Sequence, residues 1–340
     1  MSLRLYSSAL RLPGHIKRLI CQDWLSPKVV LAVLGATLGV APGYSQVNVP
    51  LEKPTPALSA STELTTPPVQ GPWLDRKLTA ERRAELLLAA MTRDEKLLLL
   101  RGFSGGFVGG RSKDPLIGPV QRMTSGYVPG VPRLGIPALH VNDASIGVAN
   151  GYDANPARPG DEATAMPSMI ALSASFEPRL AFEQGRSIAE EFRARGMNMV
   201  LGPGLNLARD ARGGRNFEYL GGEDPLLAGT LAGNAAKGIQ SVGVMSDLKH
   251  YVLHDQTADS NTVNAEIDEK ALRESDLLAF EIAVEIGHPA SVMCAYNFVN
   301  GIRACQNDFL NNVVLKGQWG WQGFVLSDWG AVNMTRSARL

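Results

Sequence analysis

The sequence lacks the features that would mark several classes of protein. Neither sign of charge is in excess, since 33 lysines and arginines balance 33 aspartates and glutamates in 340 residues. Without a charged field, the chain is not expected to bind nucleic acid or an anionic membrane surface. Its apolar run at 29–41 is shorter than the roughly 20 residues that span a bilayer, so no stable membrane span is expected. The expected partner is a neutral small molecule.

Motifs for metals and dinucleotides are also missing. No Cys-x-x-Cys pair or histidine-rich spacing suggests a metal site. No Gly-x-Gly-x-x-Gly motif opens a helix after the first expected strand, which disfavours a dinucleotide fold. We therefore predict neither a metal nor another cofactor.

Cysteine is scarce, with three residues in the whole chain. Cys21 falls in the region that we assign to a leader. Cys294 and Cys305 remain, on either side of an Asn-Gly turn. In an oxidising compartment this pair would form a disulfide, and the alternative is two buried free thiols. We favour the disulfide.

The beginning of the chain has the order of a secretory signal over residues 1–45. A basic stretch, the apolar run VVLAVLGATLGVA and small residues follow one another. This order predicts cleavage near Ser45 and export to the periplasm or the medium, and an apolar terminal helix is the alternative. Residues 46–72 are rich in Pro, Thr and Ser, which predicts an exposed linker. The folded domain is expected over residues 73–340.

Helical spacing begins the folded part. Residues 78–91 carry leucines and alanines at helical spacing, and Thr92 with Glu95 forms a capping-box pattern that predicts a further helix start. Further along, short apolar runs alternate with longer amphipathic stretches. The apolar runs cover residues 136–142, 197–202, 242–249, 291–297 and 323–328. The amphipathic stretches cover residues 177–196, 224–240 and 268–287. This alternation predicts parallel β/α units, because parallel strands need a crossover and helices then cover them.

Polar residues close most of the apolar runs. They are His140, Asn142, Asp143, Lys249, His250, Tyr296, Asn297, Ser327 and Asp328. A closed barrel brings the carboxyl ends of all its strands to one mouth, whereas an open sheet brings together only those near its switch point. We therefore predict an α/β fold of the (β/α)8 TIM-barrel type rather than a doubly wound sheet.

These strand-end groups suit the cleavage of glycosidic bonds. Glycoside cleavage develops positive charge on the sugar ring, so one carboxylate attacks or shields that carbon while a second carboxyl protonates the leaving oxygen. Charged side chains around the site would hold the ring hydroxyls by hydrogen bonds. Alone, the inventory is only suggestive, because a strand-end Asp is more often a helix cap or a paired surface group.

The sequence resembles glycoside hydrolase family 3, in its secreted β-glucosidase branch. The resemblance runs from about residue 78 to 332 through VPRLGIPALHVNDASIGVAN, NLARDARGGRNFEYLGGEDPLLAG, LKHYVLHD, ALRESDLLAFEIAV, SVMCAYNFVNG and WGWQGFVLSDWGAV. The family's catalytic domain is a (β/α)8-type barrel, which agrees with the alternation. The resemblance implies a retaining exo-β-glucosidase that releases terminal β-D-glucose from β-glucosides, with β-xylosides as the alternative substrate.

The resemblance also implies roles for single residues. It makes Asp328 the nucleophile that forms a covalent glycosyl-enzyme, and it gives sugar hydroxyls to Asp143 and Arg215. It assigns Lys249 and His250 to sugar hydroxyls as well. Because consecutive strand residues point to opposite faces, contact of both with one ligand requires a distorted strand end.

Two aromatic residues complete the set that the resemblance implies. Tyr296 would hydrogen-bond the nucleophile or stack on the sugar, and the alternative is a core tyrosine with a satisfied hydroxyl. Trp329 would form a wall of the sugar site, or else plug the mouth of the barrel.

One loop departs from the family pattern. After the Lys-His pair the family usually carries a Glu and an Arg, where this chain has Thr257 and Ser260. The β-N-acetylglucosaminidase branch uses a catalytic Asp-Ser-His on this loop. Here the stretch reads Asp259-Ser260-Asn261, so that branch is disfavoured.

The second carboxyl is the missing part of this interpretation. The resemblance places the general acid/base in an α/β domain that would follow Leu340, so we expect a carboxy-terminally truncated barrel whose acid/base is not in this chain. Glu218 and Glu223 are the alternatives within it. Two other functions stay open: a non-catalytic remnant that at most binds sugar, and an unrelated barrel lyase using Lys249 for a Schiff base.

Overall fold

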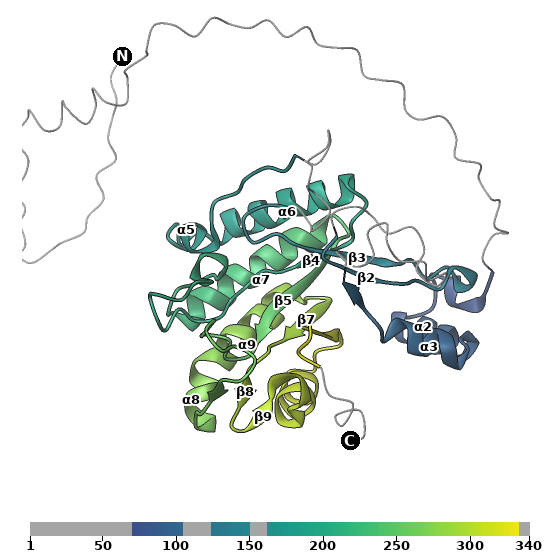
Figure 1. Cartoon of the computed structure of the whole chain (residues 1–340). Helices are drawn as coiled ribbons and strands as arrows, with labels where there is room; N and C mark the ends of the chain where they lie inside the picture. Colours follow the sequence, from purple (N-terminus) through teal and green to yellow (C-terminus); the bar gives the residue numbers. More distant parts are fainter. Residues whose placement is uncertain (1–69, 105–123, 150–161, 333–340) are drawn as a thin grey trace, which may run out of the picture. The chain divides into compact units, whose positions relative to one another are not determined.

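The computed structural model describes residues 70–104, 124–149 and 162–332 (Figure 1). All of them belong to one unit of the chain, Pro67–Leu340. The predicted leader and almost all of the predicted linker lie outside the described residues.

A curled, mixed sheet of seven strands organises this unit, in the order β1-β2-β3-β4-β5-β7-β10. Its strands are β1 (Phe103–Ser104), β2 (Gly126–Val128), β3 (Leu139–Asp143), β4 (Met199–Leu201), β5 (Met245–Tyr251), β7 (Ser291–Cys294) and β10 (Phe324–Ser327). Neighbours from β3 to β10 are parallel, and β1 and β2 join at the β3 side as antiparallel strands. The five predicted apolar runs are thus the parallel strands, placed side by side in sequence order, which confirms the predicted β/α units.

Two helices precede the first strand, and the others lie in the connections between strands. They are α2 (Ala80–Ala90), α3 (Arg93–Leu99), α5 (Met169–Ser173), α6 (Pro178–Ala194), α7 (Pro225–Ser241), α8 (Glu269–Glu274), α9 (Asp276–Gly287) and the π-helix η5 (Phe309–Gln318). Short 3-10 turns are η1 (Pro72–Leu74), η2 (Pro132–Leu134), η3 (Asn216–Glu218) and η4 (Ala304–Gln306). The predicted capping box is confirmed, since Thr92 Oγ1 accepts from the Glu95 amide at 3.2 Å and Glu95 Oε2 accepts from the Thr92 amide at 2.8 Å.

The single helix predicted over residues 268–287 is wrong, because the chain breaks at Ser275 into α8 and α9. The Ser275 hydroxyl lies 2.7 Å from the carbonyl oxygen of Ala271 and 2.9 Å from Asp276 Oδ2. A serine that hydrogen-bonds nearby groups in this way competes with the regular helical ladder. The break places the buried Asp276 at the first position of α9.

Three long helices pack in a row behind the sheet, with α7 between α6 and α9 (Figure 1). Glycines on α7 allow this close approach. A side chain at Gly238 would collide with the carbonyl oxygen of Phe182 on α6, and one at Gly229 would collide with that of Ala279 on α9. The helix backbones therefore touch over α7, and the layer that supports the strands is dense.

The two faces of the sheet bury different side chains, because residues alternate along a strand. Leu248 and Val292 face the helices and join the main core. A separate apolar cluster occupies the other, inner face and comprises Val141, Met199, Leu201 and Met293, with Leu139, Met245, Leu326 and Trp329 packed against it. Side chains that follow the carboxyl ends of the strands on this inner face therefore lie next to the apolar cluster.

A small sheet of β6 (Asn264–Ala265), β8 (Phe298–Val299) and β9 (Ile302–Arg303) lies beside the carboxyl end of β7. Cys294, the last residue of β7, forms a disulfide with Cys305 in η4, and their Cα atoms are 5.0 Å apart. The pair suggested by the sequence is therefore bonded in the structure.

Candidate active site

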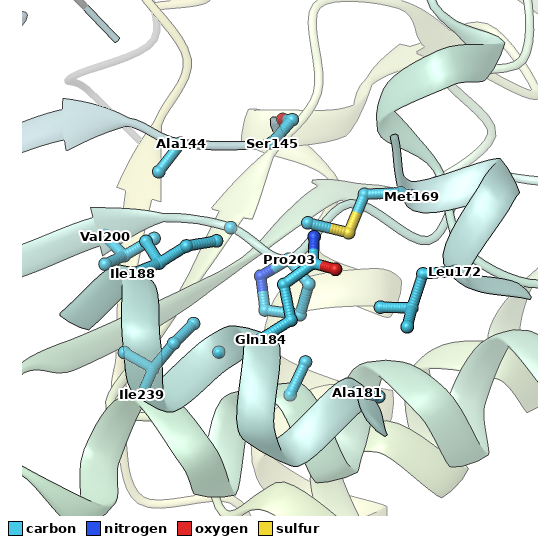
Figure 2. Close-up of a pocket in the computed structure, with 13 residues that line it drawn as sticks. Ala144, Ser145, Met169, Leu172, Ala181, Gln184, Ile188, Val200, Pro203 and Ile239 are labelled. Carbon is cyan, nitrogen blue, oxygen red and sulfur yellow. The ribbon is translucent and has the colours of Figure 1, made fainter. Parts of the chain in front are cut away.

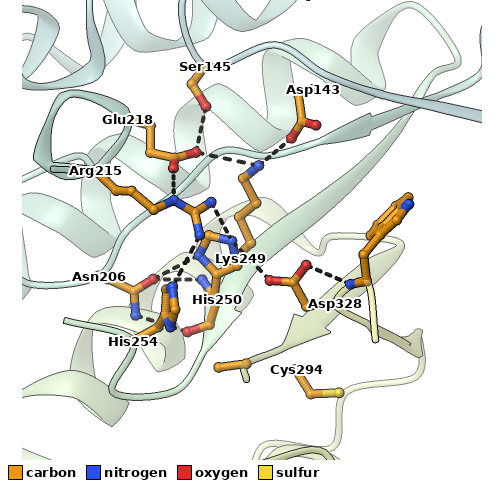
Figure 3. Close-up of polar contacts among 12 residues, drawn as sticks. Asp143, Ser145, Asn206, Arg215, Glu218, Lys249, His250, His254, Cys294 and Asp328 are labelled. Carbon is orange, nitrogen blue, oxygen red and sulfur yellow. Dashed lines mark hydrogen bonds and ion pairs between the residues drawn. The ribbon is translucent and has the colours of Figure 1, made fainter. Parts of the chain in front are cut away.

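Charged residues from distant strands meet at the carboxyl edge of the sheet (Figure 3). Lys249 Nζ donates a hydrogen bond of 2.6 Å to Asp143 Oδ1, although 106 residues separate them in sequence. Lys249 is buried, whereas 47% of the Asp143 side chain remains exposed. Burial lowers the pKa of Lys249, but Asp143 and Glu218 raise it by more than burial lowers it. The net pKa is therefore raised, and the ammonium stays charged. Asp143 therefore forms the solvent side of the pair.

The strand end that carries Lys249 is irregular. The register of β5 against β7 shifts between Leu248 and Tyr251. As a result His250, the next residue, faces the same site, with its Nε2 atom 3.5 Å from Asp328 Oδ2. The distorted strand end that would let Lys249 and His250 both face one site is therefore present in β5.

Arg215 lies between an acid and two imidazoles (Figure 3). Its Nε donates to Glu218 Oε1, its Nη1 lies 3.1 Å from His254 Nε2, and its Nη2 lies 3.0 Å from His250 Nε2. The other oxygen of Glu218 accepts from Ser145 Oγ at 3.1 Å and lies 3.5 Å from Lys249 Nζ. The guanidinium is thus held on all three nitrogens.

Asp328 is 7% exposed and follows β10 directly. Its Oδ1 accepts from the Trp329 amide at 2.7 Å, while its buried Oδ2 has no hydrogen-bond partner among the described residues. Burial raises the pKa of this carboxyl, against the opposing effects of Tyr296, the Trp329 amide and the nearby cations. Oδ1 is thus fixed by a backbone donor, and Tyr296 also acts on the carboxyl as a hydrogen-bond partner, so the site favours a carboxylate in a defined orientation.

Glu218 does not have the properties of a proton donor. Burial raises its pKa, but Lys249, Arg215 and Ser145 outweigh burial, so the net pKa is lowered. A general acid needs a pKa near the working pH. Glu223, the other alternative within the chain, is exposed and precedes Asp224, which caps α7. Neither residue has the environment of an acid catalyst.

The two aromatic candidates, Tyr296 and Trp329, differ in how they are held near Asp328. The Tyr296 ring centroid is 5.9 Å from that of His254, and burial together with Asp328 raises the pKa of its phenol. The Trp329 indole donates to the carbonyl oxygen of Ser125 at 3.2 Å and packs on the inner apolar cluster. Trp329 is therefore fixed by both ends, whereas Tyr296 is half-buried.

Sequence reasoning missed two residues that support the site. His254 is buried next to Arg215, and Asn206 bonds both the main chain and the ring of His250. A histidine in LKHYVLHD, four residues after His250, was a usable signal. No local pattern marks Asn206, because its partner lies 44 residues away.

A cleft of about 540 Å³ opens beside the charged residues. It is lined by residues 143–149 and 163–165 and by Arg215, Phe217 and Glu218. A second cavity lies behind the sheet among apolar side chains and Gln184 (Figure 2), but its volume is only about 10 Å³. That space barely admits a water molecule, so of these two cavities the cleft is the one with room for a ligand.

Two further properties bear on possible ligands. Within the described ranges, no group of three or more His, Cys, Asp or Glu residues is arranged to hold a metal ion. In the same part of the chain, no helix has the length and apolar character needed to cross a membrane.

Comparison with known proteins shows the family of this chain. Residues 122–339 match the model described as the glycosyl hydrolase family 3 N terminal domain. The chain belongs to this family. It is 42% identical over 216 residues to beta-glucosidase BoGH3A of Bacteroides ovatus, covering 62% of this chain and 29% of that protein. It is 41% identical over 207 residues to beta-glucosidase B of Emericella nidulans, covering 61% and 24%. The chain thus spans between 24% and 29% of the length of these relatives.

Solved structures of family 3 enzymes share the fold. Beta-glucosidase 3B from Thermotoga neapolitana, in complex with glucose, superposes with a TM-score of 0.64 at 38% identity, covering 72% of this chain and 33% of that chain. DesR, a beta-glucosidase from Streptomyces venezuelae in complex with D-glucose, gives a TM-score of 0.65 at 39% identity, covering 75% and 30%. Both are similar to the family 3 domain described here.

Proposed function

We propose that the family 3 domain of this chain forms the nucleophile side of a retaining β-glucosidase, with Asp328 as the attacking carboxylate. The buried Asp328 carboxyl group directly after β10, with its Oδ2 3.5 Å from His250 Nε2 among the charged residues of the sheet edge, is the observation that carries the proposal. The curled sheet would be the described part of a complete (β/α)8-type barrel. The substrate class is proposed from the similarity to beta-glucosidases.

The charges around Asp328 suit the transition state of glycoside cleavage. Two cations, Arg215 and Lys249, face three carboxylates, Asp143, Glu218 and Asp328, so the site carries one net negative charge when Asp328 is ionised. An oxocarbenium-like transition state is positive on the sugar ring and is stabilised by that excess. The cations balance the side acids, which leaves the charge of Asp328 for the reacting carbon.

Each remaining residue has a proposed role in binding. Asp143 and Lys249, which are already paired at 2.6 Å, would bind neighbouring hydroxyls. Arg215 would bind others, and His250, whose Nε2 lies 3.0 Å from Arg215 Nη2, would act through Arg215 rather than bind a hydroxyl itself. Trp329 would form an apolar wall against the ring, because its indole is held in place. A terminal glucosyl unit is the proposed occupant, and a xylosyl unit, which lacks the hydroxymethyl group, is the alternative.

The general acid/base is proposed to come from outside the described residues, in a second domain, because Glu218 is ionised and bound by cations. Losing the acid typically costs about 10²- to 10⁴-fold in rate. Export is a second proposal, which the Cys294–Cys305 disulfide supports because such bonds persist in oxidising compartments.

Covalent labelling tests the nucleophile without needing the acid. The probe is a 2-deoxy-2-fluoroglucoside whose dinitrophenolate leaving group departs without being protonated. The whole chain should therefore form a stable adduct that peptide mapping places on Asp328. Asp328→Asn should abolish labelling and lower turnover of 4-nitrophenyl β-glucoside on the order of 10⁴-fold or more, while glucose still binds. A label on another residue, or unchanged turnover in the variant, contradicts the proposal.

The same assay separates the alternatives. The matching 2-fluoroxyloside labels Asp328 faster than the glucoside if xylosides are the substrates. Glucose binding without labelling would indicate a sugar-binding domain with no catalysis of its own.

A further inference from the structure

His254 was not assigned a function by the sequence, yet it is 2% exposed and lies against the proposed sugar-binding Arg215 (Figure 3). Arginine has only donors, so any ring nitrogen in hydrogen-bond contact with it must accept. His254 Nε2 lies 3.1 Å from Arg215 Nη1, and His250 Nε2 lies 3.0 Å from Arg215 Nη2. Both imidazoles therefore present a bare Nε2 to the same guanidinium.

The other nitrogen of His250 must then carry the proton. Its neighbour Asn206 is oriented without ambiguity, because Asn206 Oδ1 accepts from the His250 main-chain amide at 2.8 Å and Asn206 Nδ2 donates to the His250 carbonyl oxygen at 2.9 Å. The same Oδ1 lies 3.3 Å from His250 Nδ1. An oxygen with no hydrogen can only accept, so His250 Nδ1 is the donor.

His254 repeats this arrangement with Asn297. The amide nitrogen of Asn297 lies 3.2 Å from the main-chain oxygens of Val252 and Phe298, which orients its Oδ1 away from them. Asn297 Oδ1 and His254 Nδ1 are both buried polar atoms, and neither has another hydrogen-bond partner in the described part of the chain. Asn297 also acts on the His254 ring as a hydrogen-bond partner. An Nδ1–H of His254 directed at Asn297 satisfies both atoms.

Both rings are neutral for the same physical reason. Burial, followed by Arg215, lowers the pKa of His254 to about 4 and that of His250 well below its usual value. A protonated ring would place a second cation against the guanidinium. Neutral rings fix its position without cancelling its charge.

We propose that His254 is a positioning residue for Arg215, which acts with His250 as a pair of neutral Nδ1–H imidazoles that accept from the two Nη atoms. The inference rests on the proposed function in one respect, the binding of sugar by Arg215. Arginine has five N–H groups, and the contacts with Glu218, His250 and His254 use three of them. One N–H on each Nη remains, so the two histidines leave Arg215 as a two-pronged donor for adjacent hydroxyls.

Nitrogen NMR of the whole chain labelled with 15N-histidine tests the tautomers directly. Between pH 6 and 8 (about one unit either side of neutral), His250 and His254 should each show a protonated Nδ1 and a bare Nε2. His288→Asn is the control, since this exposed histidine at the end of α9 should remove one signal and leave those two unchanged. An Nε2–H or doubly protonated state of His254 overturns the inference.

Substitution of His254 tests its effect on Arg215. His254→Phe keeps a flat ring but removes the acceptor, and it should weaken glucose binding about tenfold. His254→Gln offers an amide oxygen to the same Nη1, and its affinity should stay within about threefold of the parent, as expected where one neutral acceptor replaces another. For the covalent labelling reaction, His254→Phe should raise the sugar concentration needed for half-maximal rate more than it lowers the maximal rate.

The outcomes separate positioning from a purely structural role. If His254→Phe lowers the unfolding temperature but leaves the glucose affinity unchanged, or if His254→Gln binds as poorly as His254→Phe, the inference is wrong. If His254→Phe does not fold, the tautomers and the His254→Gln affinity decide. If the parent chain binds no glucose, the proposed function fails, whereas the NMR result still decides whether His254 holds Arg215 as described.

Discussion

Arg209 and Arg215 lie in the same loop, six residues apart, and they bond different kinds of partner. Arg209 donates through Nε to Asp255 Oδ2 at 2.7 Å and through Nη2 to Asp276 Oδ2 and to Ser275 Oγ. Its partners connect the segment after β5 with the start of α9. Arg215 bonds one acid and two neutral rings, beside a cleft.

The difference decides which arginine can serve a ligand. Two carboxyl groups bond Arg209, and burial together with Asp276 raises the pKa of Asp255 although Arg209 acts to lower it. Arg215 keeps more of its charge uncompensated at short range, since imidazoles accept without carrying a negative charge. Arg209 is thus a structural tie, and Arg215 is the proposed binding group.

The largest expected effect is a loss of stability when the structural tie made by Arg209 is removed. Arg209→Met should lower the free energy of unfolding by about 2–3 kcal/mol, because it leaves the buried Asp276 with only a serine partner. Urea unfolding followed by circular dichroism measures the loss. The double variant Arg209→Met/Asp276→Asn should recover part of it.

Arg212 supplies the control, because its side chain is 90% exposed and contacts only the nearby Asp210 among the ion pairs of the described residues. Arg212→Ala should leave the unfolding curve unchanged. An Arg209 variant as stable as the Arg212 variant would remove the basis for calling Arg209 a tie.

The next effect concerns the binding arginine. Arg215→Met should weaken glucose binding about 10- to 100-fold, since charge-assisted hydrogen bonds to the sugar are lost. Its effect on unfolding should be smaller than that of Arg209→Met, because Glu218 retains Lys249 and Ser145. Titration calorimetry and urea unfolding of both variants give the two readouts. The opposite ranking in either readout would contradict the division between tie and binding group.

Arg215→Lys sharpens this result. Lysine keeps the positive charge but cannot donate in a fixed fork to both His250 and His254. Its glucose affinity should fall between that of the parent and that of Arg215→Met. Full recovery by lysine would show that charge alone matters.

The smallest effect concerns a carboxyl that has no arginine. Asp247 lies on β5 beneath Lys249, fully buried, and neither of its oxygens has a hydrogen-bond partner among the described residues. Burial raises its pKa from 3.8 to about 8. The folded chain therefore keeps a proton that the unfolded chain loses near pH 4 (about the ordinary value for Asp). This contribution to stability is complete below that pH and is lost as the pH rises to about 8.

Urea unfolding at several pH values between these limits measures the loss. The slope from one such group is at most about 1.4 kcal/mol per pH unit. Asp247→Asn cannot titrate, so its stability relative to the parent should increase as the pH rises. Parallel curves for the two proteins would show that Asp247 is ionised in the folded state.

The regular part of the fold could be predicted from the sequence because its signals are local. Five apolar runs became the five parallel strands, and the Thr92 cap follows from residues within one turn. The strands β1 and β2 and the break at Ser275 were not predicted. No apolar run with strand periodicity marks β1 or β2. The Ser275 hydroxyl bonds nearby groups of the helix, and the helical pattern of the sequence does not show that the chain breaks there.

The site divides in the same way. Strand-end position, together with family resemblance, indicated Asp143, Lys249, His250 and Asp328, because a parallel sheet brings those ends together. The orientation of Arg215 depends on His254 and on a fold-wide arrangement that no short pattern contains. What could be predicted was which residues meet, and what could not was which atom faces which.

The irregular end of β5 also determines how closely its side chains are spaced along the site. Side chains on one face of a regular strand are roughly 7 Å apart, twice the rise per residue. Neighbouring hydroxyl groups on a pyranose ring are spaced more finely than that, so a regular strand would skip a position on the ring. By presenting Lys249 and His250 in succession, β5 makes contacts with Asp143 and Asp328 at the interval of single residues. A change that restores the regular register would turn Lys249 or His250 to the other face of the sheet and remove its contacts at the site.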